Sequence, residues 1–310
     1  LWTNQTKATN LGSGSSLTLS PSTVSPGDSV QCTVTATDPH GASDSADVSV
    51  SVDNTDPSID SIGISPNSGV TTTSSLSCDV SASDVDGGSL TTVYQWTVNT
   101  NVVGSAMQLD LTPSMASPSD TVTCTATVTD ASGGTASGSA TVTVENTDPV
   151  FTADASITPD SGVFTGTVLS CSAVGTDVDD GSTTLSYVWM NGSNTIGSGQ
   201  TLTVSTSNSD VGDTLTCEVT ATDSDGGTSS STDSVIVENT APSISNAAIT
   251  PNGGVVSYTV LTCAGQSTDN DGESVTTTYD WTNQTQATDL GSGGILILSS
   301  STVAPGDTVQ

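Results

Sequence analysis

Hydrophobic and polar residues alternate along short segments of this chain, most clearly within residues 57–148. An alternation of period two puts one set of side chains on a buried face of a β-strand and the other set on an exposed face. The interleaved residues are mostly Thr and Ser, which suit an exposed sheet face, and Gly-rich turns separate the segments. No helical period competes, so the pattern predicts an all-β fold. The alternating apolar positions are Leu76, Cys78, Val80 and Ala82; Val122, Cys124, Ala126 and Val128; and Ala140, Val142 and Val144.

The chain repeats itself with a period of about 93 residues. Its six cysteines recur at steps of 46 or 47 residues, and three periods separate Trp2 from Trp281. The marker Asn-Thr-Asp-Pro at 54–57 returns at 146–149 and, as Asn-Thr-Ala-Pro, at 239–242. Self-similarity at a fixed period indicates an array, whose function belongs to the array rather than to one pocket. Cutting at the marker predicts a partial repeat at 1–56, complete repeats at 57–148 and 149–241, and a partial repeat at 242–310.

Each complete repeat has a cysteine, a tryptophan and a second cysteine in that order. This order resembles immunoglobulin-like β-sandwiches, where strands B and F carry the cysteines and a strand C tryptophan packs on their bridge. The resemblance implies disulfides Cys78–Cys124 and Cys171–Cys217, with Cys32 on a strand F and Cys263 on a strand B. The alternative, a bridge from Cys32 to Cys78, would join different repeats across a boundary. Persistent disulfides predict an extracellular or cell-surface location.

Further motifs resemble bacterial-type Ig-like and PKD-like tandem repeats of surface proteins. They are Tyr187 and Trp189, the segment 212–223, and Val-Glu-Asn-Thr at 237–240. The resemblance covers the whole chain and implies tandem immunoglobulin-like β-sandwiches, with strands C to G in repeat 1–56 and strands A to E in repeat 242–310. Such families serve as rods, stalks, adhesins and filament subunits, so the resemblance implies architecture more firmly than function.

The segment 144–151 is similar to the calcium-binding linker of cadherins. In the immunoglobulin fold the B–C and F–G loops share one end of the sandwich, so the linker acids should lie near the acids of those loops. Ca²⁺ takes six to eight oxygen ligands and would neutralise such a cluster, stiffening one repeat against the next. The other interpretation is that Asp and Gly are simply good turn formers. The best candidate site combines Glu145, Asp148, Asp177, Asp179, Asp223 and Asp225.

The preceding junction offers a weaker candidate calcium site. The acids that remain there are Asp53, Asp56, Asp84, Asp86 and Asp130, and Ser132 replaces the second acid of the F–G loop. In repeat 1–56 His40 stands at that position, so a site there is doubtful.

Three Asn-x-Ser/Thr sequons occupy one repeated position, two residues after a strand C tryptophan. The sequons begin at Asn4, Asn191 and Asn283, whereas Val98 holds the position in repeat 57–148. A predicted exposed turn just past strand C suits an N-linked glycan. Copying of a repeat in a chain rich in Asn, Ser and Thr would also produce such sequons without glycans.

Composition restricts the partners and the chemistry. The chain has 33 Asp and Glu residues against one Lys or Arg, a formal net charge of −32. This charge excludes nucleic acid as a partner and disfavours anionic membrane surfaces, and no run is long enough to span a membrane. With one His and one Lys, no nucleophilic catalytic set can repeat with the period, so an enzyme is not expected. The tryptophans keep register with the cysteines, which favours core packing over sugar stacking.

The sequence therefore predicts a structural extracellular protein, a filament, stalk or surface fibre of disulfide-stapled repeats. Its partners would be neighbouring repeats or copies of itself. The alternative is an adhesin or ligand-binding ectodomain, in which one repeat should carry an outlying loop. Residues 1–31 match 280–310 closely and both ends fall inside a repeat. We therefore expect either an excerpt of a longer array or strand complementation between neighbouring chains.

Overall fold

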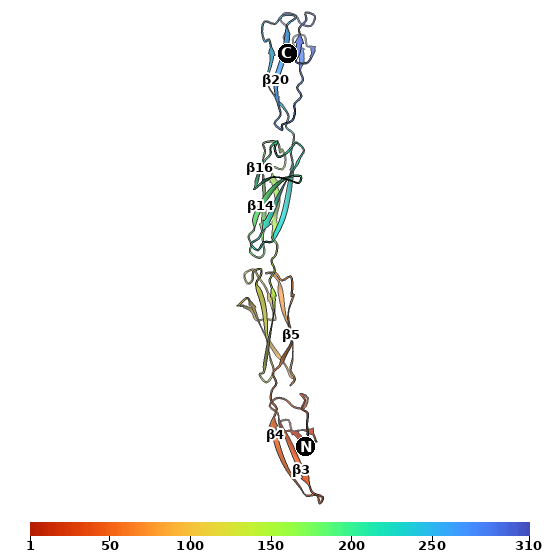
Figure 1. Cartoon of the computed structure of the whole chain (residues 1–310), viewed down its shortest axis with the longest axis vertical. Helices are drawn as coiled ribbons and strands as arrows, with labels where there is room; N and C mark the ends of the chain where they lie inside the picture. Colours follow the sequence, from red (N-terminus) through yellow and green to blue (C-terminus); the bar gives the residue numbers. More distant parts are fainter. The chain divides into compact units, whose positions relative to one another are not determined.

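The computed structural model describes all 310 residues and consists of strands and turns, which confirms the all-β prediction (Figure 1). The chain forms two compact units. One comprises Leu1–Pro149 with the loops Asp177–Ser182 and Asp223–Gly227, and the other comprises Val150–Thr176, Thr183–Thr222 and Thr228–Gln310. The four repeat boundaries stay a prediction, and the repeats are named below by their sequence ranges.

Repeat 57–148 is a sandwich of two antiparallel sheets, ordered β5-β6-β9 and β11-β10-β7-β8. Thr and Ser alternate with apolar residues along β10, whose Val122, Cys124, Ala126 and Val128 are all fully buried. The strands are β5 (Ser58–Ser65), β6 (Ser75–Ser83), β7 (Thr91–Val98), β8 (Asn101–Gly104), β9 (Gln108–Asp110), β10 (Thr121–Thr129) and β11 (Thr135–Thr143).

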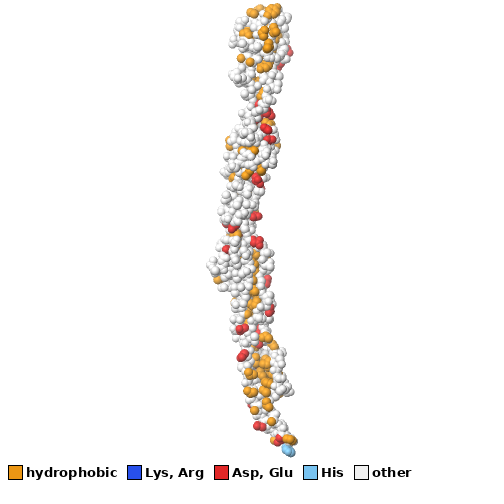
Figure 2. Space-filling model, viewed as in Figure 1, with side chains coloured by type: hydrophobic (Ala, Val, Ile, Leu, Met, Phe, Trp, Pro, Cys, Tyr) orange, Lys and Arg blue, Asp and Glu red, His pale blue; other side chains and the backbone are white.

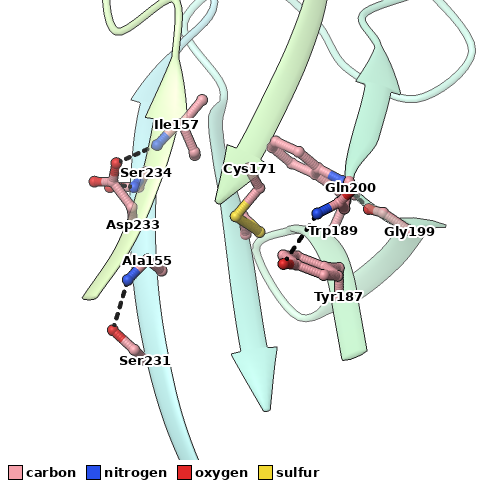
Figure 3. Close-up of a disulfide and its surroundings, with 11 residues drawn as sticks. Ala155, Ile157, Cys171, Tyr187, Trp189, Gly199, Gln200, Ser231, Asp233 and Ser234 are labelled. Carbon is pink, nitrogen blue, oxygen red and sulfur yellow. Dashed lines mark hydrogen bonds between the residues drawn. A yellow bond between two sulfur atoms is a disulfide. The ribbon is translucent and has the colours of Figure 1, made fainter. Parts of the chain in front are cut away.

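Repeat 149–241 has the same topology, with sheets ordered β12-β13-β16 and β15-β14-β17-β18. Side chains of β18 bond the edge strand of the other sheet: Asp233 accepts from the Ile157 amide at 2.7 Å and Ser231 from the Ala155 amide at 3.0 Å (Figure 3). These bonds cover an edge that would otherwise offer free backbone groups. The strands are β12 (Val150–Thr158), β13 (Val168–Thr176), β14 (Thr184–Asn191), β15 (Asn194–Ser198), β16 (Thr201–Thr203), β17 (Thr214–Thr222) and β18 (Thr228–Ile236).

The two outer repeats contain parts of the same arrangement. Repeat 1–56 holds the four-stranded sheet β2-β1-β3-β4, and repeat 242–310 holds β19-β20-β23 and the pair β21-β22. Their strands are β1 (Trp2–Asn4), β2 (Thr9–Gly12), β3 (Ser29–Thr37), β4 (Ser43–Ser51), β19 (Ser243–Thr250), β20 (Val260–Thr268), β21 (Asp280–Asn283), β22 (Thr288–Ser292) and β23 (Ile295–Ile297).

A disulfide and a tryptophan lie at the centre of each complete repeat. Cys78 on β6 bonds to Cys124 on β10 across the two sheets, and Trp96 faces Cys124 in the register of β7 and β10. Repeat 149–241 repeats this with Cys171, Cys217 and Trp189 (Figure 3). Both tryptophans are fully buried, and each indole N–H donates to a backbone carbonyl, Ala106 or Gly199.

The cysteines thus pair within a repeat and not across a boundary. Cys32 and Cys263 are free and half-buried. In repeat 242–310 Trp281 is also buried, whereas Trp2 of repeat 1–56 is half-buried. Trp96, Trp189 and Trp281 are therefore core residues and not sugar-stacking platforms.

Removing the bridge from one repeat should cost a large share of its stability. The pair is 46 residues apart, so loss of Cys171–Cys217 in a C171A/C217A variant should lower the free energy of unfolding by about 4 kcal/mol on the chain-entropy argument. Hydrogen exchange of β13 and β17 amides would measure the change in this repeat alone. The matched control is C32A/C263A, which removes two free cysteines. Equal effects of both changes would contradict a stabilising role of the bridge.

Candidate functional site at the junctions between repeats

The linker glutamates bond the repeat that they leave. The Glu145 carboxylate accepts from the Gly69 amide at 2.8 Å, and the Glu145 amide donates to the Val70 carbonyl at 2.6 Å. Glu238 does the same with Gly162 and Val163, at 2.7 Å each. Glu145, predicted as a metal ligand, therefore closes the turn before β6 of its own repeat.

An aspartate of each B–C loop accepts a backbone bond from the linker that precedes it. Thr55 N donates to Asp86 at 2.6 Å, Thr147 N to Asp179 at 2.8 Å and Thr240 N to Asp271 at 2.6 Å. The same contact thus recurs at three junctions. It is an interaction between a carboxylate and a neutral amide, which is stronger than a bond between neutral groups.

Asp179 also reaches the preceding repeat. The hydroxyl of Thr72, a fully buried residue in the turn before β6, donates to the second carboxylate oxygen of Asp179. Because Asp179 is itself only 7% exposed, the bond is shielded from water. One carboxylate therefore joins the B–C loop of repeat 149–241, the linker, and a turn of repeat 57–148.

The other aspartates of these loops serve in turns. Asp84 accepts from the Asp86 amide at 2.8 Å, and Asp177 accepts from the Asp179 amide at 2.7 Å. An aspartate that bonds the backbone two residues on is the usual Asx turn. One carboxylate oxygen of Asp84 and one of Asp177 therefore serve in turn formation, the alternative to calcium binding that the sequence also allowed.

The F–G loops hold a buried aspartate that the linker asparagine contacts. Asp223 accepts from the amides of Asp225 at 2.9 Å and Gly227 at 2.8 Å, while Asn146 Nδ2 donates to its other oxygen at 3.0 Å. Asp130 has the same partners in Ser132, Gly134 and Asn54. In both loops the hydrogen bond from the asparagine side chain is the main reason why the pKa of the aspartate lies below its usual value. Asp225 is exposed and contributes its amide to the turn.

Two carboxylates converge beside the second glycine of each loop. A Cβ on Gly227 would lie 2.4 Å from Asp223 Oδ2 and 2.7 Å from Asp148 Oδ1. A Cβ on Gly134 would lie 2.4 Å from Asp130 Oδ2 and 2.5 Å from Asp56 Oδ1. Only glycine permits this approach, and no basic side chain lies there to balance the two charges, since the one Lys of the chain, Lys7, pairs with Asp28.

Buried oxygen atoms without a hydrogen-bond partner lie on residues of the linker at 146–147 and of two B–C loops. They are Asn146 Oδ1, Thr147 Oγ1, Asp177 Oδ2 and, at the last junction, Asp271 Oδ1. A buried acceptor without a donor is costly, so these atoms fit a bound cation or water. No three or more His, Cys, Asp or Glu side chains gather in an arrangement that could hold a metal ion. The arrangement found here is a pair of carboxylates with neutral oxygens, and a metal site of Glu145, Asp148, Asp177, Asp179, Asp223 and Asp225 stays a prediction.

At the first junction the candidate residues line one cavity. It has a volume of about 270 Å³, and its walls include Asp84, Asp86 and Asp130 together with Asn54, Ser25 and Ser132. This cavity joins residues of repeats 1–56 and 57–148 within one compact unit.

The sequon asparagines are buried or half-buried hydrogen-bond donors. Asn4 and Asn283 are completely buried, and their Nδ2 atoms donate to Asp28 at 2.6 Å and to Asp307 at 2.8 Å. Asn191 Nδ2 donates to Asp213, also at 2.6 Å. Since a glycan is attached to Nδ2, a glycan on a folded repeat would have to break these bonds and draw the side chain out.

Sequence reasoning missed the donors that hold these junctions, namely the amide of Thr147, the hydroxyl of Thr72 and the side chain of Asn146. The signal was present in the marker Asn-Thr-Asp-Pro, whose first two residues make these contacts at 54–55 and 146–147.

Comparisons with known proteins add little about function. No known protein family and no curated protein matches the chain. Similar solved structures include a Ca²⁺-stabilised adhesin that helps an Antarctic bacterium bind ice, at 13% identity over 91% of this chain and 80% of that one, with a TM-score of 0.32. A tetra-tandem repeat from the extending region of a large adhesion protein has 16% identity over 93% and 74%, with a TM-score of 0.32. Drosophila N-cadherin EC1-4 has 13% identity over 91% and 77%, with a TM-score of 0.28. At such scores these similarities carry no argument about what this chain binds.

No helix of the chain is long and apolar enough to cross a membrane.

Loss of the linker asparagine should make the junction more sensitive to acid. The pKa of Asp223 is lowered in the folded protein, so its contribution to stability is complete above about pH 4, the ordinary carboxyl value, and is lost as the pH falls below it. An Asn146→Ala change should raise the pKa of Asp223 and move the acid-unfolding midpoint to higher pH. Carboxyl-carbon NMR titration would check the pKa, with the exposed Asn101→Ala as control. An unchanged pKa would show that Asn146 is not the cause.

Proposed function

We propose that this chain is a structural protein of the cell exterior, in which tandem repeats form a filament, stalk or surface fibre. The observation that supports it is the recurring junction: a linker threonine amide bonds a B–C loop aspartate at 55, 147 and 240. Every linker makes this contact with the repeat that follows. Such a recurring contact is what we expect of an array in which consecutive repeats are joined in the same way.

The remaining chemistry agrees with an extracellular and non-enzymatic role. The two disulfides need an oxidising compartment. The paired acids of the B–C loops, which could be taken for a catalytic pair, accept backbone bonds in each copy. His40 is exposed in a turn. The partners we propose are neighbouring repeats and copies of the chain, because a net charge of −32 opposes nucleic acid and anionic surfaces.

Calcium is the cation that we propose at these junctions. Asp148 and Asp223 would hold it from two sides, with Asn146 and Asp177 supplying neutral and charged oxygens that now lack donors. Ca²⁺ suits such a set because it accepts carboxylate, amide and water oxygens in flexible geometry. When bound it would neutralise the converging carboxylates and so hold the linker against the F–G loop.

Removal of the converging carboxylates should weaken calcium binding at one junction. A D148N/D223N variant should lose at least tenfold in calcium affinity at that site by calorimetric titration, and its melting temperature should no longer rise with Ca²⁺. The matched control is D79N/D110N, which removes two charges from a sheet face of repeat 57–148. If all three proteins bind equally, the acids attract cations only as a diffuse atmosphere.

Electron microscopy of native material before and after EDTA tests the structural role. We expect fibres with an axial period of one repeat, which become limp or fragment when the chelator removes Ca²⁺. Fibres unaffected by EDTA would support the structural function but contradict a role of calcium in it. Isolated short particles in both conditions would contradict the fibre and favour an ectodomain that binds a ligand.

N-linked glycosylation at Asn4, Asn191 and Asn283 stays a prediction from the sequence. Because the three amide nitrogens are engaged with Asp28, Asp213 and Asp307, a glycan would have to be attached before the repeat folds.

A further inference from the structure

The chain contains two Asn-Gly dipeptides, Asn191-Gly192 and Asn252-Gly253. In such a dipeptide the backbone nitrogen of the glycine can attack the side-chain carbonyl carbon of the asparagine, because glycine has no Cβ to obstruct the approach. The two dipeptides are chemically identical, so any difference in their reactivity must come from the surrounding structure.

Asn252 lies in the turn between β19 and β20, and nothing restrains its side chain. Asn252 and Gly253 are both exposed, and no hydrogen bond holds the asparagine side chain. A Cβ built on Gly253 would meet no atom within 4 Å, so the space around the dipeptide is open. The side chain is therefore free to rotate toward the backbone nitrogen that would attack it.

Asn191, in contrast, is held in place. It is half-buried at the end of β14, and its Nδ2 atom donates to Asp213 at 2.6 Å and to the Asn208 carbonyl at 3.2 Å. The attack would require a rotation that breaks both bonds, one of which has a charged acceptor. Loss of that bond alone should slow the reaction at Asn191 by at least about tenfold.

The turn before strand B has the same shape in three repeats, but only repeat 242–310 places a glycine directly after an asparagine. A later glycine of the turn has a nearly constant φ, which is 64° at Gly69, 65° at Gly162 and 69° at Gly254. The dipeptide that precedes it is Asn67-Ser68, Asp160-Ser161 or Asn252-Gly253. Asn67 is exposed as well, but the side chain of the serine that follows obstructs the attack on it.

We propose that Asn252 is a site of spontaneous deamidation. The Gly253 nitrogen forms a bond to Asn252 Cγ, and the bond from Cγ to Nδ2 breaks. The proton of the backbone amide passes to the leaving nitrogen, which departs as ammonia, and a cyclic imide remains. Water then opens the imide at either carbonyl, so that aspartate or isoaspartate results at position 252. The proposal goes beyond the structural function and does not depend on it.

The two products should differ in their effect on the turn. An aspartate is compatible with it, because repeat 149–241 has Asp160 at this position, with Ser161 Oγ donating to its carboxylate at 3.1 Å. The nearby Gly162 amide still donates to the linker carboxylate of Glu238, at 2.7 Å. Isoaspartate instead adds a carbon atom to the backbone and would displace the glycine that follows. The isoaspartate form is therefore the one that alters the turn.

Either product adds a negative charge that no basic side chain neutralises. Acidic side chains are scattered over the face of the molecule seen in Figure 2. The one Lys or Arg of the chain, Lys7, pairs with Asp28 in repeat 1–56. Modified and unmodified chains should therefore separate by anion exchange.

Peptide mass spectrometry of the full chain, sampled during incubation at neutral pH, tests the proposal. Asn252 should convert at least about tenfold faster than Asn191 or Asn67 in the folded protein. A Gly253→Ser variant, which takes the residue of both complete repeats, should slow conversion at Asn252 and leave Asn191 unchanged. This variant should fold, because Gly253 does not have a left-handed φ and its Cβ position is open. In urea, where the bonds of Asn191 are lost, Asn191 should approach the rate of Asn252 while Asn67 stays slow.

Equal rates at Asn252 and Asn191 in the folded chain would overturn the proposal, because the structure would then not select the site. A rate at Asn252 that Gly253→Ser leaves unchanged would also overturn it, since the glycine nitrogen would not be the attacking group. Conversion of Asn252 in urea but not in the folded chain would show that the turn protects this residue, which is the opposite of what we propose.

Discussion

The packing of one tryptophan against one disulfide is the interaction on which each complete repeat depends. The chain is only 32% hydrophobic and 3% aromatic, so each sandwich has few large side chains with which to exclude water. Trp96 and Trp189 fill the centre, and the bridge beside each joins the two sheets that must stay together for the core to exist. Because the tryptophan and the disulfide stabilise the core, the outer faces of the sheets can consist largely of Thr and Ser.

The junctions show how a chain with almost no basic residues stabilises many carboxylates. Asp130, Asp179 and Asp223 each accept two or more bonds from amides, hydroxyls or asparagine side chains in place of ion pairs. Bonds from neutral donors do not reduce the net charge, so converging pairs such as Asp148 and Asp223 keep their mutual repulsion. The cation that we propose at the junctions would therefore answer to the composition as much as to the geometry.

The sequence predicted the fold well and the junction only in outline. Period-two alternation and the spacing of Cys78, Trp96 and Cys124 were sufficient for the strands, because both signals arise within one repeat and reflect burial. The positions of the loop acids were also foreseeable, but their partners were not. Whether Asp179 binds a metal or accepts from Thr147 and Thr72 depends on side-chain directions across a linker, which residue types do not encode. The burial of Asn4 was missed for a related reason: its partner Asp28 lies 24 residues away, and a sequon reveals only its local sequence.

The disulfide also limits how far the protein can stretch. Under tension along the backbone, a repeat that loses its sandwich can lengthen only by the residues outside its covalent loop. Cys78 and Cys124 are separated by 46 positions, about half of the repeat, so roughly 150 Å of potential contour length stays locked while the bridge is intact. An array of such repeats would yield in short steps and regain its folded length easily. Extensibility of this material would therefore be set by the redox state of its surroundings.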